Sequence, residues 1–118
     1  MNSEYFFKEN CYITEMHNTP EDPDVSIARV RVKPGATTNW HKLKHTTERY
    51  IIRNGEGLVE IGTNDPKVVS TGAVLVIPPN TLQRLCNTGS DDLIFLAVCT
   101  PRFIIENYER DNSTGISV

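Results

Sequence analysis

The chain has 118 residues, of which 38% are hydrophobic, and this length suits one hydrophobic core and therefore one domain over 1–118. Its net charge of −3 comes from interspersed acidic and basic residues, so it has no basic patch and nucleic acid is excluded as the expected partner. The longest apolar run, 73–77, is too short to span a bilayer, and no membrane association is expected.

The cysteine pattern and the N-terminus predict a cytoplasmic protein. Cys11, Cys86 and Cys99 are odd in number and lack metal-ligand spacing, and the last two lie in apolar runs typical of buried thiols. This argues against an oxidised disulfide framework. The first ten residues mix acidic and basic side chains where a signal peptide needs a long apolar run.

Short strands are predicted from the N-terminus onward. Aromatic and β-branched residues predict N-terminal strands within 5–15, and a loop rich in proline and acidic residues follows at 18–24. The next segment alternates strictly, with Ala28, Val30 and Val32 on one face and basic residues on the other. A period of two is typical of a half-buried strand.

The middle of the chain holds its densest turn signals. Strands are predicted at 40–43 and 48–53, and Asn54-Gly55 predicts a hairpin that returns through a strand at 58–61. Both turn residues tolerate a positive φ, which the tight hairpin turn requires.

The remaining strands complete an all-β pattern. The uninterrupted apolar run 73–77 predicts a strand buried on both faces. Further strands are expected at 67–69, 82–87 and 93–99, a short helix or arm at 103–110, and no element at 113–118. Many short strands at regular spacing with almost no helix predict a β-sandwich or barrel, with its core over about 26–99 and a C-terminal tail over 100–118.

A spacing in the middle of the chain carries a resemblance to a known family. Gly35 is followed after five residues by His41, then Leu43, then Glu48 after four more and Gly55 after six. The cupin superfamily has a first motif with the same spacing, in which the position of Leu43 is a second histidine. The chain resembles that family at this motif.

A second motif strengthens the resemblance. Gly72 is followed after five residues by Pro78, then Asn80, then Gln83 after two and Asn87 after three. In cupins Asn80 is a glycine and Gln83 a histidine. The resemblance implies a single-domain cupin β-barrel, also called a double-stranded β-helix or jelly roll. The chain looks like a subgroup of small cupins in which Leu and Gln replace two of the metal-binding histidines.

The resemblance implies a metal site that this sequence alters. Cupins usually bind one divalent ion with three histidines and a glutamate, so the ligands carried over here are His41, Glu48 and Gln83. The expected ion is manganese, iron, nickel or zinc, and a metal-free site stays open because an amide carbonyl is a weak ligand. His45 lies roughly 13 Å from His41 along a regular strand, so it could join them only through a turn.

Three kinds of function follow from these residues. The first is a metal-dependent enzyme for a small oxygen-rich substrate, such as a sugar, sugar acid or carboxylate, of isomerase, lyase or dioxygenase type. The second is a metal-free enzyme in which His41 and Glu48 form an acid–base pair. The third is a non-catalytic module that binds a small molecule. In each, Leu43, Tyr50 and Leu85 are the expected pocket wall.

The resemblance also implies a homodimer. Jelly rolls have open sheet edges that need cover. The aromatic segments 5–7 and 103–108 are the expected cover in this sequence.

Overall fold

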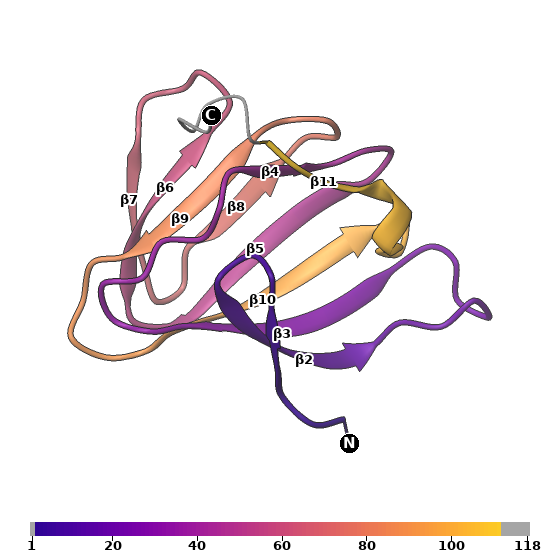
Figure 1. Ribbon diagram of the computed structural model, residues 1–118, viewed down its shortest axis with the longest axis horizontal. Coiled ribbons are helices and arrows are strands. Elements are labelled where there is room, and N and C mark those ends of the chain that lie inside the picture. Colours follow the sequence, from indigo (N-terminus) through magenta and orange to yellow (C-terminus); the bar gives the residue numbers. More distant parts are fainter. Residues whose placement is uncertain (1, 112–118) are drawn as a thin grey trace.

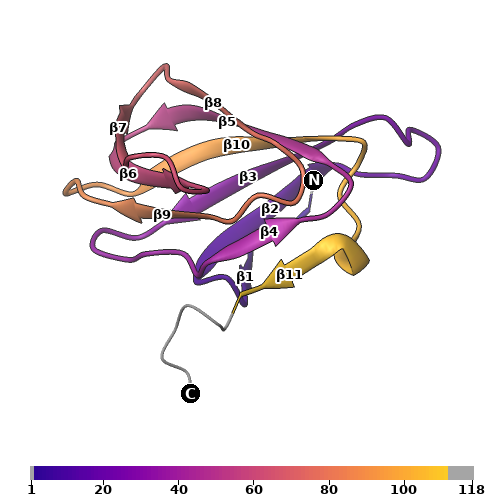
Figure 2. The same cartoon turned by 90° about the horizontal axis from the view of Figure 1, so that it is seen from above.

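The computed structural model describes residues 2–111, which form two facing antiparallel sheets (Figures 1 and 2). The six-stranded sheet has the order β1 (Tyr5–Phe7), β2 (Cys11–His17), β3 (Ser26–Val32), β10 (Leu93–Thr100), β5 (Thr47–Asn54) and β8 (Val74–Ile77). The five-stranded sheet has the order β11 (Tyr108–Arg110), β4 (His41–Leu43), β9 (Gln83–Asn87), β6 (Glu56–Ile61) and β7 (Lys67–Ser70). This arrangement confirms the predicted all-β jelly roll.

The core lies between the inner faces of the two sheets. Strand β10 is central because it pairs with both β3 and β5, and its side chains alternate strictly between buried and half-buried. Its inner face carries Leu93, Phe95, Ala97 and Cys99, all of them buried. The facing sheet supplies the buried side chains of Val59, Val69 and Leu85. The alternation puts an apolar surface inward and a more polar one toward solvent.

Strand β8 corrects one expectation. Its apolar run was predicted to be buried on both faces, but Val74 and Val76 are 58% and 52% exposed while Leu75 and Ile77 are buried. The prediction was wrong because β8 is the edge strand of the six-stranded sheet and only its inner face meets the core. A short apolar run alone does not distinguish one-sided from two-sided burial.

The Asn54-Gly55 turn corrects a second expectation. It does not close a hairpin of paired strands, since β5 pairs with β10 and β8 while β6 pairs with β7 and β9. The turn instead carries the chain from one sheet to the other. Gly55 has φ +97°, and a Cβ there would lie 3.0 Å from the carbonyl oxygen of Asp92. Gly55 thus has the positive φ that the turn signal predicts, whereas Asn54 does not, and turn chemistry does not specify which strands pair.

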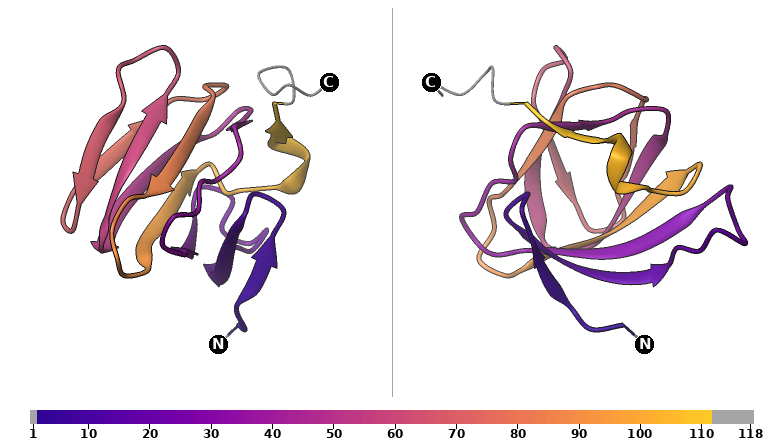
Figure 3. Two further views of the ribbon diagram at one scale, coloured as in Figure 1. Left: turned by 60° about the vertical axis from the view of Figure 1, so that its left-hand side comes forward. Right: turned by 45° about the vertical axis from the view of Figure 1, so that its right-hand side comes forward.

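Segments near the two chain ends extend the two sheets. The expected N-terminal strands are β1 and β2, which continue the six-stranded sheet beyond β3 (Figure 3). The expected arm becomes the 3₁₀ helix η1 (Ile105–Asn107) and β11, which pairs with β4 so that Tyr108 lies opposite Leu43. Within residues 2–111 no helix is long and apolar enough to cross a membrane. Residues 113–118, where no element was expected, lie outside the described range.

Gly57 on β6 packs so closely that a methyl group would not fit. A Cβ there would lie 2.7 Å from the Cys86 carbonyl oxygen and 2.9 Å from Leu93 Cδ2. We therefore expect Gly57→Ala to lower the free energy of unfolding by about 2–3 kcal/mol, because backbone has to shift to admit it. Glu56→Ala, exposed on the same strand, should change it by less than about 0.5 kcal/mol. Urea denaturation measures both, and equal values would contradict this account.

Candidate functional site

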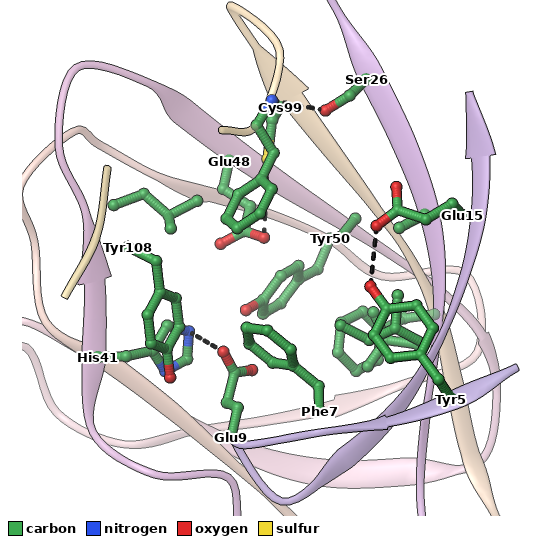
Figure 4. A pocket seen from close by; sticks show the side chains of 17 residues that line it. Tyr5, Phe7, Glu9, Glu15, Ser26, His41, Glu48, Tyr50, Cys99 and Tyr108 are labelled. Carbon is green, nitrogen blue, oxygen red and sulfur yellow. Dashed lines mark hydrogen bonds and ion pairs between the residues drawn. The ribbon is translucent and has the colours of Figure 1, made fainter. Parts of the chain in front are cut away.

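A cavity of about 60 Å³ lies between the sheets, beside β4 and β11 (Figure 4). The inner faces of β3, β5 and β10 form one wall, and the N-terminal strands and the C-terminal segment close the sides. Most of the wall is apolar or aromatic, with Phe7, Leu43 and Phe95 among its members. Into this apolar space point a few polar groups, among them Glu9, His41, Glu48 and Tyr50.

His41 is held as a neutral imidazole with a defined tautomer. Its ring is 2% exposed, and Nδ1 lies 2.6 Å from the carbonyl oxygen of Asn39. A carbonyl only accepts, so Nδ1 carries the hydrogen and Nε2 keeps the lone pair. Burial lowers the pKa of His41 below its ordinary value, against the opposing effects of the Asn39 hydrogen bond and the Glu48 charge. The ring therefore presents a basic nitrogen.

Glu48 on β5 is a buried carboxyl that titrates near neutrality. Its Oε1 accepts a hydrogen bond from Gln83 Nε2 at 2.7 Å, and its Oε2 lies 3.9 Å from the thiol of Cys99. Loss of hydration raises the pKa of Glu48 to about 7, and the nearby Glu9 carboxyl raises it further, whereas the nearby His41 imidazole and the hydrogen bond from Gln83 lower it. Glu48 can therefore take up or release a proton at neutral pH.

Gln83 on β9 links the two sheets through the site. Its amide N–H donates to Glu48, and its carbonyl oxygen accepts from the hydroxyl of Tyr50. Burial raises the pKa of Tyr50 well above its ordinary value, so this hydroxyl stays a donor. Gln83 also lies directly opposite His41 in the register of β4 and β9. The chain of hydrogen bonds from Tyr50 through Gln83 orients the Glu48 carboxyl.

Glu9, which sequence reasoning missed, is a second carboxyl in the cavity. It lies in the turn between β1 and β2, its side chain is 12% exposed, and its Oε2 is 3.1 Å from His41 Nε2. Desolvation raises the pKa of Glu9 to about 8, although a weak hydrogen bond from Cys11 opposes the rise. The protonated carboxyl then donates to the lone pair on Nε2. No motif marks Glu9, because it sits in a turn of mixed charge that reads as a solvated surface.

Tyr108 on β11 covers His41. The two rings stack with centroids 5.5 Å apart and planes 20° apart, and Phe7 meets the Tyr108 ring edge-on at 5.2 Å. The Tyr108 hydroxyl oxygen is buried and has no hydrogen-bond partner within residues 2–111. A group of this kind is costly to bury without a partner.

Of the other residues predicted for the site, some line the cavity and some do not. Leu43 and Tyr50 line the cavity, whereas Leu85 is buried in the core and is not part of the lining. His45 is exposed in the turn after β4, with φ +67°, and is also outside the lining. The structure thus brings His41, Glu48 and Gln83 together and leaves His45 at the surface.

The arrangement of donors does not fit a resident metal ion. Within residues 2–111 no group of three or more His, Cys, Asp or Glu side chains is placed to hold one. Gln83 directs its N–H at Glu48 and gives its oxygen to Tyr50, and the lone pair of His41 faces Glu9. The three expected ligands do not offer free lone pairs to one point. Metal binding by them stays a prediction.

Comparison with known proteins identifies the family. The family model of the cupin domain matches residues 28–99. An uncharacterized protein of Methanocaldococcus jannaschii, MJ1618, is 30% identical over 107 residues, which is 89% of this chain and 85% of that protein. The chain belongs to the cupin family.

Solved structures agree in fold. KdgF from Halomonas sp. superposes with a TM-score of 0.75 and 18% identity, over 86% of this chain and 90% of that one. Pac13 of Streptomyces, described as a nucleoside dehydratase, superposes with a TM-score of 0.77 and 16% identity, over 92% of this chain and 83% of that one. At such identities the likeness shows a shared fold.

The raised pKa of Glu9 gives a prediction for stability. A group that holds its proton more tightly when folded makes the free energy of unfolding fall as pH rises toward the folded pKa, here about 8. Between pH 6.5 and 8 the wild type should lose about 1.5 kcal/mol more than Glu9→Gln, because unfolded His41 titrates alike in both proteins. Burial raises the pKa of Cys11 as well, so its thiol stays protonated across this window.

Urea denaturation at the two pH values measures the difference. Glu56→Gln, an exposed carboxyl on β6, is the matched control and should keep the wild-type pH dependence. Parallel curves for the wild type and Glu9→Gln would show that Glu9 does not titrate abnormally.

Proposed function

We propose that this chain is an enzyme of isomerase or lyase type that moves protons on a small molecule, with His41 as base and Glu48 as acid. One observation carries the proposal. A basic nitrogen of fixed tautomer and a protonated carboxyl with a pKa of about 7 line the same apolar cavity, each held by its own hydrogen-bond partner. A neutral imidazole and a protonated carboxyl that line one cavity suit an acid–base pair.

The geometry supports a definite division of labour. Once the Glu9 carboxyl turns away from Nε2, His41 Nε2 accepts a proton from a substrate carbon, and the Asn39 carbonyl stabilises the resulting imidazolium through Nδ1–H. Glu48 gives its proton to a substrate oxygen, and Gln83 keeps the carboxyl in position. Return of both protons at new positions completes an isomerisation. Departure of the protonated oxygen as water completes a dehydration.

Glu9 supports the same cycle. Its carboxyl lies 3.1 Å from His41 Nε2 and has a raised pKa of about 8, so it can exchange a proton with the imidazole between turnovers. The apolar wall limits competing water. The Pac13 structure, described as that of a nucleoside dehydratase, supports dehydration as a chemistry that this fold can host.

A metal-dependent enzyme is the second candidate. His41 and Glu48 line the cavity, and Gln83 donates to Glu48 and lies opposite His41 in the strand register, which supports the ligand set that the cupin motif implies. An ion there requires Gln83 to turn its carbonyl away from Tyr50 and His41 to leave Glu9. The substrate in this case is the small sugar, sugar acid or carboxylate expected for cupins. A non-catalytic binding module is the third candidate, distinguished by ligand affinity without turnover.

We also propose a cytoplasmic homodimer. The outer edge of β1 has no neighbouring strand within residues 2–111, and Phe6 on β1 and Met16 on β2 are exposed beside it. An exposed edge with apolar side chains is a surface that soluble proteins usually cover. A second copy can cover it by edge-to-edge pairing.

The acid–base assignment predicts the outcome of a proton-exchange experiment. The protein is incubated in deuterated water with a panel of small hydroxyketones and aminoketones, and exchange at the carbon next to the carbonyl is followed by proton NMR. We expect Glu48→Gln and His41→Gln each to lower the rate about 100-fold or more, because each removes one proton-transfer group. The matched control Glu56→Gln, outside the cavity, should keep the wild-type rate.

Chelation and metal analysis separate the candidates. Full exchange after treatment with EDTA supports the proposed pair. A stoichiometric metal, with activity lost on chelation and restored by manganese or iron, would establish the second candidate instead. Saturable binding that Glu48→Gln leaves intact, with no exchange in the panel, would establish the third.

The dimer proposal predicts a mass twice that of the chain. Phe6→Asp places a charge on the apolar edge and should give a monomer in size-exclusion chromatography with light scattering. Val68→Asp, at an exposed position on β7, is the matched control and should stay dimeric. A monomeric wild type would refute the dimer.

A further inference from the structure

The His41 ring is held in its own plane by polar contacts at its two nitrogens. Nδ1 donates to the carbonyl oxygen of Asn39 at 2.6 Å, and Nε2 lies 3.1 Å from Oε2 of Glu9. Such a bond fixes the direction of one nitrogen, but a single bond leaves the ring free to tilt about it. In the proposed reaction Glu9 turns away before Nε2 takes a proton. The contact at Nε2 is therefore lost at the step in which the position of this nitrogen matters.

The ring of Tyr108 supplies a contact that involves neither nitrogen (Figure 4). The two rings stack with centroids 5.5 Å apart and planes 20° apart. A flat neighbour at this distance opposes tilting of the imidazole out of its plane, which the hydrogen bond at Nδ1 does not. Because Tyr108 lies on β11 and Glu9 in the turn between β1 and β2, the stack does not depend on the Glu9 carboxyl.

The backbone around Tyr108 is tied to the rest of the molecule on both sides. The backbone N–H of Lys44 donates to the carbonyl oxygen of Asn107 at 2.9 Å, and that of Asp111 donates to the carbonyl oxygen of Trp40 at 3.0 Å. Between these bonds β11 pairs with β4. A residue held by strand pairing is placed more accurately than one on a loop. The Tyr108 ring is therefore a fixed support for the imidazole.

The contacts of Tyr108 use its ring and not its hydroxyl. Phe7 meets the ring edge-on with centroids 5.2 Å apart, and Nζ of Lys8 lies 4.9 Å from the ring centroid. The hydroxyl oxygen is buried and has no hydrogen-bond partner within residues 2–111. Loss of the hydroxyl should therefore leave the stack intact, whereas loss of the ring removes it.

From these observations we infer that Tyr108 is a positioning residue, whose ring holds the His41 imidazole in its reactive orientation once the Glu9 carboxyl has turned away. The inference rests on the proposed function and adds to it a residue outside the span 28–99 that the cupin model matches. Tyr108 acts through His41 and carries no proton itself. A displacement of about 1 Å in a reacting group can cost about 100-fold in rate, so the tilt of this ring matters.

Ring order at His41 tests the support without a substrate. The full chain is labelled with ¹³C in its histidine rings, and the order parameter of the His41 Cδ2–H bond is measured by NMR relaxation. Glu9→Ala imitates the state in which Glu9 has turned away, and there the order parameter should stay near the rigid-backbone value of about 0.85. Adding Tyr108→Leu should lower it below about 0.6, whereas adding Tyr108→Phe should leave it high.

Tyr12→Leu is the matched control for the loss of a tyrosine ring. Tyr12 also has a charged neighbour, since Cζ of Arg31 lies 4.5 Å from its ring centroid, but it is not part of the cavity lining. Added to Glu9→Ala, it should leave the His41 ring ordered. Tyr108→Met, which also lacks a flat ring, replaces Tyr108→Leu if that variant fails to fold.

Proton exchange tests the consequence for the reaction. With the hydroxyketone and aminoketone panel, Tyr108→Leu should lower the exchange rate at saturating substrate about tenfold, because the base is less well placed. Tyr108→Phe keeps the ring and should restore the rate to within about twofold of the wild type. Tyr12→Leu should keep the wild-type rate.

Each result bears on the inference separately from the proposed function. A His41 ring that stays ordered when Glu9→Ala and Tyr108→Leu are combined would overturn the inference, and so would a wild-type exchange rate in Tyr108→Leu. Proton exchange that depends on His41 and Glu48 would still stand in either case. If the wild type exchanges no compound of the panel, the enzyme is refuted, and ring order alone then decides whether Tyr108 positions His41.

Discussion

The desolvation of two carboxyl groups in one apolar cavity is the constraint on which the site depends. Glu9 and Glu48 cannot both be ionised cheaply there, because each lacks water and each repels the other. Each carboxyl has an uncharged hydrogen-bond partner instead of a cationic one: the His41 imidazole contacts Glu9, and the Gln83 amide donates to Glu48. The result is a pair of carboxyl groups that gain and lose protons near neutral pH, which is the property that proton transfer needs.

The jelly roll supplies this constraint through the pairing of its strands. β5 lies between β10 and β8, so Glu48 projects inward among buried apolar side chains. β4 faces it from the other sheet and pairs with β11, which brings the Tyr108 ring over His41. Gln83 reaches across from β9 and ties the two sheets together at the site. The site is therefore built from regular strands, and their rigidity keeps the proton-carrying atoms in place.

Sequence reasoning located the parts of the site that lie on regular strands. The motifs located His41, Glu48 and Gln83 because the spacing between motif positions is kept even where another residue replaces a histidine. Tyr50 was predicted to line the pocket because it shares the inward face of β5 with Glu48. The jelly roll followed from many short strands. What failed depended on long-range pairing: β8 looked fully buried because a local apolar run does not reveal an edge.

Glu9 and Tyr108 were not predicted as site residues, for a related reason. Each lies near one end of the chain, and only pairing of β1 with β2 and of β11 with β4 brings it to the cavity. Neither carries a local signal, because a glutamate in a turn and a tyrosine in a polar tail are ordinary surface residues. The apolar cavity around these two side chains forms only when the strands have paired.

The position of Glu9 also bears on how this architecture can diversify. The cupin domain is recognised over residues 28–99, and Glu9 falls outside it, on a hairpin that adds to the sheet edge without changing the barrel. A change in the length of that hairpin, or substitution of its side chains, would alter one wall of the cavity and leave the barrel strands unchanged. Relatives with the same central motifs can thus diverge in chemistry through this hairpin, and a comparison limited to residues 28–99 would leave out the segment that distinguishes them.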